Sequence, residues 1–182
     1  MCRKYKAKIT PKMYFGKGDI LEFDGDALIC PCFTDLTYCK ESKLVSSIIE
    51  LAGKDLEKEL SSIGFCDFGS AVITKGYGLK VKNIIFLPYK DKENPDNIID
   101  FILLHKAFRS AFNLASLYNL KTLATVPLFV GYRKRDFINR IMVIFGLEKK
   151  EEKTLHPHEV VDIIIGVLDE YKGKIEDLVI YR

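Results

Sequence analysis

The sequence predicts an α/β protein in which a mixed central sheet lies between two layers of helices, a three-layer α/β/α sandwich. The first observation is a strand, a glycine-bearing turn and a second strand, in Gly69–Leu79 and Asn83–Tyr89. The second of these runs is apolar on both faces, as in a strand that helices cover on either side. The third observation is that strand-like and helix-like runs alternate along the chain, which favours a mostly parallel or mixed sheet.

The length and composition are those of an ordinary globular protein. We expect one domain spanning residues 1–182, since a chain of 182 residues can bury about two-thirds or more of the surface that it exposes when unfolded. Hydrophobic residues make up 48% of the chain and charged residues 29%. The formal net charge of +3 is too mild to predict a nucleic-acid partner.

Segment patterns argue against a membrane partner and against secretion. The apolar run Val160–Leu168 is interrupted by Asp162 and is far shorter than the ~20 residues of a membrane span. Met1–Lys6 leads into no apolar segment, so we expect no signal peptide. Five cysteines without secretory features favour reduced thiols, and we expect a cytoplasmic protein.

The amino-terminal part is predicted to consist of short strands and loops. The expected elements are an edge strand at Tyr5–Ile9, a strand at Lys12–Gly16, a turn at Lys17–Leu21, a buried strand over Asp26–Cys32 that stops at Pro31, and a polar loop at 33–42. The strand pair described above follows at about 69–88.

Helices are predicted from apolar residues three and four apart and from their capping residues. The expected helices are one capped by Ser42 and broken at Gly53, one over Asp55–Ile63, one capped by Asp96 or Asn97 and running to Tyr118, and one that starts at His156 and closes at Gly173. The buried stripe of the third helix is expected to hold Phe101, Leu104, Phe108, Ala111, Phe112 and Ala115, and that of the last helix Val160, Val161, Ile164, Ile165 and Leu168. Strands are expected at Thr122–Leu128 and Glu176–Tyr181, with a possible extra helix at Asp136–Leu147.

Several of these segments together resemble one known family. They are Lys17-Gly-Asp-Ile20, Asp26-Ala-Leu-Ile29, Ala52-Gly53, Gly69-Ser-Ala-Val-Ile-Thr-Lys-Gly-Tyr77, Asn83–Pro88 and Val126-Pro-Leu128. In this order they are similar to the macro domain, a module that binds ADP-ribose. The resemblance implies a three-layer fold and ADP-ribose or a related adenine nucleotide as partner.

The resemblance implies that Asp19 and Ile20 read the adenine. The carboxylate of Asp19 would accept a hydrogen bond from the adenine amino group, and the Ile20 amide would assist it. The alternative is that Asp19 only caps its own turn.

The first ligand loop departs from the family pattern. Macro domains carry an Asn-Ala-Ala-Asn-like run and several glycines there, which hold the distal ribose and the diphosphate. The corresponding segment Cys30–Ser42 contains neither asparagine nor glycine. This departure argues against efficient hydrolysis.

The second ligand loop retains a single glycine, Gly131, among basic and aromatic residues. Arg133 and its basic neighbours, Lys134, Arg135 and Arg140, can clamp a diphosphate in place of backbone amides, or can form a solvent-facing helix start. The resemblance implies that Phe129 or Tyr132 lies against a ribose and that Tyr181 lies near the adenine; the alternative for each is plain packing.

Other kinds of site find less support in the sequence. Cys30, Cys32 and Cys39 offer only three of the four ligands that structural zinc usually takes, so we expect no metal. A cysteine nucleophile would need a base, and His105 lies within a predicted helix. No P-loop or Ser-His-Asp arrangement is found, and we expect no cofactor.

Three functions therefore stand as hypotheses. The leading one is a divergent macro domain that binds ADP-ribose or a related adenine nucleotide without efficient turnover. The second is a hydrolase acting on ADP-ribose derivatives or ADP-ribosylated substrates, with Asp35 among the residues that orient the water. The third is an interaction domain with a vestigial pocket.

Overall fold

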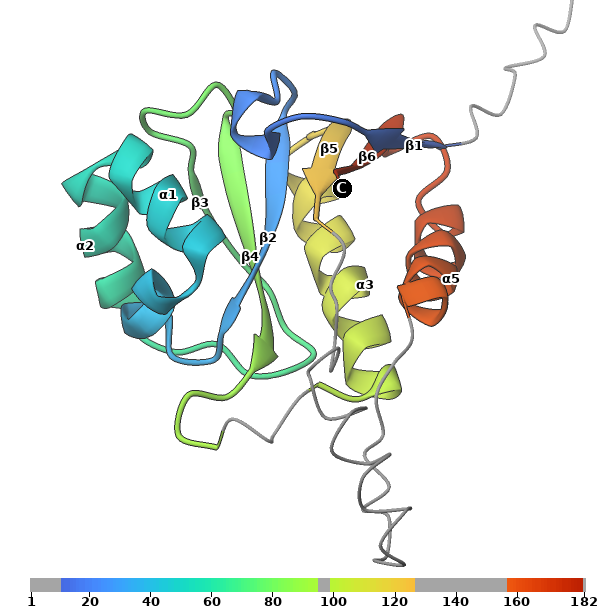
Figure 1. The fold of residues 1–182 in the computed structure, drawn as a ribbon. Helices are drawn as coiled ribbons and strands as arrows, with labels where there is room; N and C mark the ends of the chain where they lie inside the picture. The colour runs from blue at the N-terminus through green and yellow to red at the C-terminus, as the bar shows by residue number, and fades with distance from the viewer. Residues whose placement is uncertain (1–10, 95–98, 127–156, 182) are drawn as a thin grey trace, which may run out of the picture.

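The computed structural model describes residues 11–94, 99–126 and 157–181. The chain order of the elements is β1 (Lys12–Gly16), the 3-10 helix η1 (Ile20–Glu22), β2 (Ala27–Phe33), the 3-10 helix η2 (Leu36–Glu41), α1 (Lys43–Ala52), α2 (Lys54–Ile63), β3 (Val72–Lys75), β4 (Asn83–Lys90), α3 (Phe101–Leu117), β5 (Thr122–Thr125), α5 (Pro157–Asp169) and β6 (Asp177–Tyr181) (Figure 1). Strands and helices alternate as the sequence predicts.

The strands that the structure describes form one six-stranded sheet in the order β1-β6-β5-β2-β4-β3. Every neighbouring pair is parallel except β3 with β4, which is antiparallel. The prediction of a mixed, mostly parallel sheet is therefore confirmed. The predicted pair of strands joined by a glycine turn is β3 and β4, at one edge.

Helices cover both faces of the sheet, which confirms the three-layer architecture (Figure 1). Along β2, Ala27 and Ile29 belong to the core beneath α3 and α5, whereas Leu28 and Cys30 belong to the core beneath α1 and α2. Successive side chains of a strand point to opposite faces, so a strand that is apolar at every position requires a helix layer on each side.

The β3–β4 turn needs glycine because backbone carbonyl groups approach it closely at two positions. A Cβ added at Gly76 would lie 1.9 Å from the carbonyl oxygen of Val81, within the same turn. A Cβ added at Gly78 would lie 2.3 Å from the carbonyl oxygen of Leu51, in α1. These contacts let the turn pack tightly against the carboxyl end of α1.

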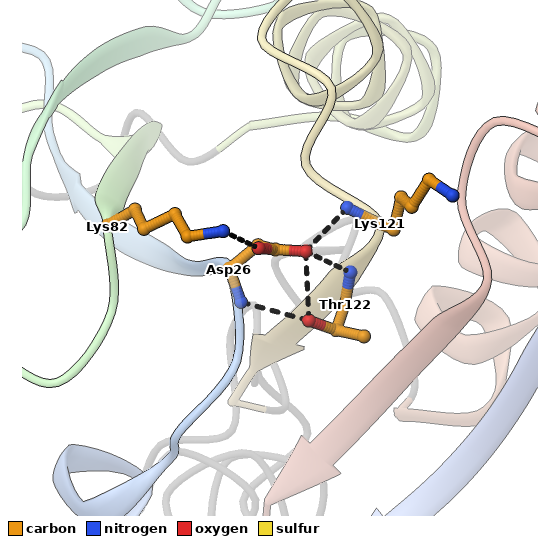
Figure 2. Close-up of polar contacts among 4 residues, drawn as sticks. All are labelled: Asp26, Lys82, Lys121 and Thr122. Carbon is orange, nitrogen blue, oxygen red and sulfur yellow. Dashed lines mark hydrogen bonds and ion pairs between the residues drawn. The ribbon is translucent and has the colours of Figure 1, made fainter.

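Asp26 ties together the starts of three parallel strands (Figure 2). Its Oδ2 accepts hydrogen bonds from the amides of Lys121 and Thr122, at 2.9 and 3.1 Å, and from the Thr122 hydroxyl at 3.1 Å. Its Oδ1 lies 2.7 Å from Lys82 Nζ, at the start of β4. Burial by itself would raise the pKa of Asp26, but these hydrogen bonds outweigh it and hold the pKa at about 2.

Backbone hydrogen bonds continue this anchoring along the whole amino edge of the sheet. The Asp26 carbonyl accepts from the amides of Lys82 and Asn83, at the start of β4. The Lys121 carbonyl accepts from the amide of Glu176, whose own carbonyl accepts from Lys12. The five parallel strands therefore start from one connected set of hydrogen bonds, which fixes their register at the edge opposite to their carboxyl ends.

The start of α3 differs from the prediction. Its N-cap is Asp100, whose carboxylate accepts a hydrogen bond from the Leu103 amide at 2.8 Å, and not Asp96 or Asn97. Phe101 is 52% exposed because it lies on the first turn, beyond the packed part of the stripe, which begins at Leu104 and includes Ala107. The remaining predicted members of the stripe, Phe108, Ala111, Phe112 and Ala115, are buried.

The buried face of α5 is also rotated relative to the prediction. Ile165 is 46% exposed, whereas Ile163 and Val167 are buried together with Val160, Ile164 and Leu168. The run is apolar at almost every position, so its periodicity is compatible with two adjacent stripes, and the contact with α3 selects one. The helix ends at Asp169 rather than at Gly173, which instead supplies a positive φ of 82° in the turn before β6.

The end of β2 and the segment after it were predicted incorrectly. The strand runs through Pro31 to Phe33, because β5 pairs with β2 only as far as Ile29 in the described residues, and a proline is tolerated where a strand has one partner. The polar loop predicted at 33–42 contains the helix η2 and the fully buried Leu36. Ser42 is the N-cap of α1 by position, without a side-chain hydrogen bond.

The other predicted elements are confirmed to within a residue or two where they can be compared. The strand predicted at Tyr5–Ile9 and the helix predicted at Asp136–Leu147 lie outside the described residues, as do the last two residues of the strand predicted at Thr122–Leu128. No helix in the described part of the chain is long and apolar enough to cross a membrane.

Candidate functional site

The carboxyl ends of the parallel strands gather the residues that the sequence singles out. Gly16, at the end of β1, pairs in register with Tyr181, at the end of β6. The turn that carries Asp19 and Ile20 follows directly after Gly16. Loops at this edge of an α/β sheet are where ligands usually bind.

The turn after β1 presents a carboxylate and an amide side by side. Gly18 adopts a φ of +115°, which favours glycine, and it directs the chain into η1. Asp19 is exposed and caps η1, with its Oδ1 accepting from the Leu21 amide at 2.9 Å. Among the described residues we find no partner for Oδ2 and no acceptor for the Ile20 amide. The capping role inferred for Asp19 is thus present, and it leaves one acceptor and one donor available.

Tyr181 is held by contacts on two sides. An added Cβ at Gly16 would lie 3.2 Å from two atoms of the Tyr181 ring, so the ring lies across the Gly16 backbone. The Phe23 ring meets Tyr181 edge to face, with 6.2 Å between the ring centroids and 77° between the ring planes. Both side chains are half-buried. Their packing gives the region an aromatic wall with a defined orientation.

The helix η1 and the aromatic pair lie on the same face of the sheet as α1 and α2. Ile20 is buried in the core of this face, and Phe23, Val126 and Tyr181 pack against that core while remaining half-buried. Asp19 and Phe23 stand at the two ends of η1, which is a single turn long. A carboxylate, an amide and two aromatic rings are thereby brought within one small region by β1, η1 and β6.

A second group of polar residues follows the carboxyl ends of β2 and β4. Asp35 Oδ1 accepts hydrogen bonds from the amide of Thr37, at 2.9 Å, and from its hydroxyl. Lys92 Nζ lies 3.8 Å from Asp35 Oδ2 and 3.4 Å from the centroid of the Tyr38 ring. The hydroxyl of Thr37, more than any other group, holds the pKa of Asp35 below its ordinary value.

Three cysteines are core residues. Cys30 and Cys32 alternate with Pro31 along β2, which puts both thiols into the buried core beneath α1 and α2, and Cys66 joins the same core. Burial raises the pKa of the Cys66 thiol to about 11. No group of three or more metal-ligating side chains is found in the described residues.

For these three described cysteines, activation by His105 is contradicted by this arrangement. His105 belongs to α3, which covers the face of the sheet opposite to the core that holds the three buried thiols. The sheet therefore separates His105 from them, and no proton can pass directly between imidazole and thiol.

Only some of the predicted binding residues lie in the part of the chain that the structure describes. It brings Asp19, Ile20 and Tyr181 to one region. The remaining predicted residues, Phe129, Gly131, Tyr132 and Arg133, lie outside the described residues, as do Lys134, Arg135 and Arg140.

Two residues of these regions were missed by the sequence reasoning. Phe23 contacts Tyr181 across 158 positions of sequence, and Lys92 reaches Tyr38 and Asp35 from a loop that reads as a plain charged turn. Gly25 leaves room for the Phe23 ring, since an added Cβ there would lie 2.2 Å from it, but only the structure shows this contact. Nothing in the local sequence marks Lys92.

The chain is a three-layer α/β/α domain with polar loop residues at the carboxyl edge of its sheet. A family model for the macro domain matches residues 38–137, more than half of the chain. The protein therefore belongs to the macro domain family.

Solved structures with the same fold are macrodomains. The Mycobacterium tuberculosis DarG macrodomain superposes with a TM-score of 0.67 at 16% identity, covering 94% of this chain and 97% of that one. The Trypanosoma brucei macrodomain in complex with ADP-ribose gives 0.66 at 18% identity, covering 94% and 63%. The Oceanobacillus iheyensis macrodomain with ADP gives 0.63 at 18% identity, covering 91% and 80%.

These likenesses differ in how much of each relative is matched. The present chain spans 62% of the Trypanosoma brucei macrodomain chain that was solved in complex with ADP. No match was found among curated protein sequences.

Proposed function

We propose that this macro domain binds ADP-ribose or a related adenine nucleotide and does not turn it over efficiently. The observation that carries the proposal is the turn at Gly18–Ile20. Its carboxylate has one oxygen engaged in capping and a second without a partner in the described residues, next to an amide without an acceptor there. An acceptor beside a donor matches the amino group and ring nitrogen along one edge of adenine.

The neighbouring aromatic rings support the same ligand. Tyr181 and Phe23 offer half-buried ring surface on the same side of the sheet as Ile20. A base can pack against such a surface, and aromatic contacts of this kind contribute roughly 1–3 kcal/mol per base. Structural relatives that carry ADP or ADP-ribose make the same class of ligand the first to test.

The described residues offer little support for catalysis. The segment Cys30–Ser42, which corresponds to the asparagine-bearing loop of the family, here consists of the end of β2, with Cys30 and Cys32 buried in the core, and the helix η2. Asp35, the residue of the hydrolase hypothesis, is an anchored carboxylate, which is compatible with orienting a water and does not separate the two functions. The loss of the asparagine-bearing loop is therefore the observation that favours binding without efficient turnover.

The test is calorimetry with ADP-ribose on the wild type and on two variants of Asp19. We expect Asp19→Ala to weaken binding about ten-fold or more, as for a lost charge-assisted hydrogen bond. Asp19→Ser should weaken it similarly although serine still caps η1, which separates binding from capping. Asp24→Ala removes an exposed carboxylate from the same connection and should leave the affinity unchanged.

Equal affinities for the wild type and both Asp19 variants would reject the assignment of Asp19. If no adenine nucleotide raises the unfolding temperature of the wild type, the proposal itself fails, and an interaction domain with a vestigial pocket becomes the better description. Release of ADP-ribose from an ADP-ribosylated protein at a substantial rate would instead favour the hydrolase.

A further inference from the structure

The carboxyl ends of β2 and β4 meet at a point where α/β sheets usually leave room for a ligand. After β2 the chain continues into α1 and α2 on one face of the sheet, and after β4 it continues into α3 on the other (Figure 1). Adjacent parallel strands whose connections leave to opposite faces form a topological switch point, which is where open α/β sheets bind ligands. In this chain a side chain lies across that point.

The side chain is that of Lys92, which reaches from the loop after β4 to the loop after β2. The last paired residues of the two strands are Phe33 and Lys90, and Asp35 follows the first of them by two positions, as Lys92 follows the second. The Lys92 ammonium lies 3.8 Å from Asp35 Oδ2 and 3.4 Å from the centroid of the Tyr38 ring. Its side chain is only 35% exposed, so it forms a packed bridge between the two loops.

The polar and aromatic groups around this bridge are engaged with one another. Asp35 Oδ1 accepts hydrogen bonds from the amide and the hydroxyl of Thr37, and Asp35 Oδ2 faces the Lys92 ammonium. The same ammonium covers one face of the Tyr38 ring, and Phe33 meets that ring edge to face with 6.4 Å between the ring centroids. A ligand that enters between the two loops must therefore break these contacts before it can make its own.

The bridge lies well away from the residues proposed to bind the adenine. From β6, which carries Tyr181, the sheet order passes through β5 and β2 to β4, which is about 14 Å across three strand spacings. A nucleotide whose base lies against Tyr181 therefore brings only its remote end to Lys92. In ADP-ribose the remote end is a second ribose, whereas ADP ends at its phosphates and is shorter by that sugar.

We propose that Lys92 closes the carboxyl edge between β2 and β4, so that the domain selects adenine nucleotides ending at their phosphates over ADP-ribose. The inference rests on the proposed function and narrows its ligand to the class of nucleoside diphosphates. A second ribose has to displace Lys92 from Tyr38 and from Asp35, and the loss of the cation–π contact and the ion pair weakens its binding. ADP leaves the bridge intact and keeps its full affinity.

The test compares ADP with ADP-ribose by calorimetry on the wild type and on Lys92→Ala, which removes both contacts of the bridge. The wild type should bind ADP about five-fold or more tightly than ADP-ribose. Lys92→Ala should gain about five-fold in affinity for ADP-ribose, while its affinity for ADP stays the same. The matched control is Lys75→Ala, which makes the same change of charge at an exposed position on the opposite edge of the sheet and should change neither affinity.

The possible outcomes separate this inference from the function on which it rests. A wild type that binds ADP-ribose as tightly as ADP, or more tightly, overturns the inference without any variant, so it stays testable even if the variant misfolds. A preference for ADP that is unchanged in Lys92→Ala overturns the role of Lys92, and so does an equal loss of affinity for both ligands. A wild type that binds neither nucleotide removes the proposed function and the inference with it.

Discussion

Replacing Asp26 by asparagine should destabilise the protein without changing the proposed nucleotide site at the opposite edge of the sheet. The side chain is only 17% exposed and accepts two amide hydrogen bonds and one hydroxyl hydrogen bond at the amino edge of the sheet. Asparagine has the same shape, but its amide group donates where the carboxylate accepts, so at least one of the surrounding donors loses its acceptor. The starts of β2 and β5 are the segments affected.

The shifted pKa gives the size of the effect. A pKa of about 2 in the folded protein against an ordinary 3.8 corresponds to about 2.5 kcal/mol in the free energy of unfolding at neutral pH. Lys82 is 72% exposed, so solvent screens its share, and about 2 kcal/mol is the figure to test. For a chain of this length that loss lowers the unfolding temperature by about 4–8 °C.

The sign of the pH dependence follows from the direction of the shift. Because the folded pKa lies below the unfolded one, the stabilisation by Asp26 is present in full above the unfolded value of 3.8 and is lost as the pH falls through about 2. The difference in stability between wild type and Asp26→Asn should therefore shrink on acidification, to about half at pH 3.

The assay is urea unfolding of the wild type, Asp26→Asn and Asp24→Asn at pH 7 and pH 3. Asp24→Asn makes the same chemical change at an exposed position two residues away and should behave as the wild type. Equal midpoints for Asp26→Asn and the wild type at pH 7, or a difference that does not shrink at pH 3, would refute the reasoning.

Two further predictions concern backbone packing and thiol chemistry. Gly76→Ala should lower the free energy of unfolding by about 2 kcal/mol or more, since its Cβ would lie 1.9 Å from the Val81 carbonyl oxygen. Denaturant unfolding measures this loss. The control is Gly166→Ala in α5, where an added Cβ meets open space, and it should be neutral or stabilising by up to about 1 kcal/mol. Cys66 should resist alkylation at pH 8 until the protein unfolds, because its pKa is raised to about 11. Mass spectrometry of the alkylated peptide checks this, and rapid labelling in the folded protein would contradict the burial of the thiol.

The local sequence pattern was sufficient to predict an element wherever a single physical requirement, such as burial of one face, determines the conformation of the segment. The short apolar run of β4, β-branched at Ile84 and Ile85, favours a strand covered on both faces, and the spacing of Leu56 and Leu60 favours one buried stripe of α2. The turn at Gly18–Ile20 was likewise recognisable, because glycine at a positive φ followed by a capping aspartate is a local arrangement. Its proximity to Tyr181 required the resemblance to a family.

Predictions were wrong where several local solutions have nearly equal energy. In α5 an almost continuous apolar run allows two neighbouring stripes, and only packing against α3 places Ile163 inside and Ile165 outside. In β2, Pro31 is a strand breaker by itself, and it is tolerated because β5 ends its pairing at Ile29. These outcomes depend on neighbours that are distant in sequence.

The amino-acid sequence by itself determined the order of strands and helices, the apolar faces and the capping turn of Asp19, because each depends on interactions between residues a few positions apart. Only the tertiary structure decided which side chains meet across the sheet. Phe23 against Tyr181, Lys92 against Asp35 and Asp26 against Lys121 join residues at least 55 positions apart. Contacts of this kind are selected by strand order and register, which no short stretch of sequence encodes.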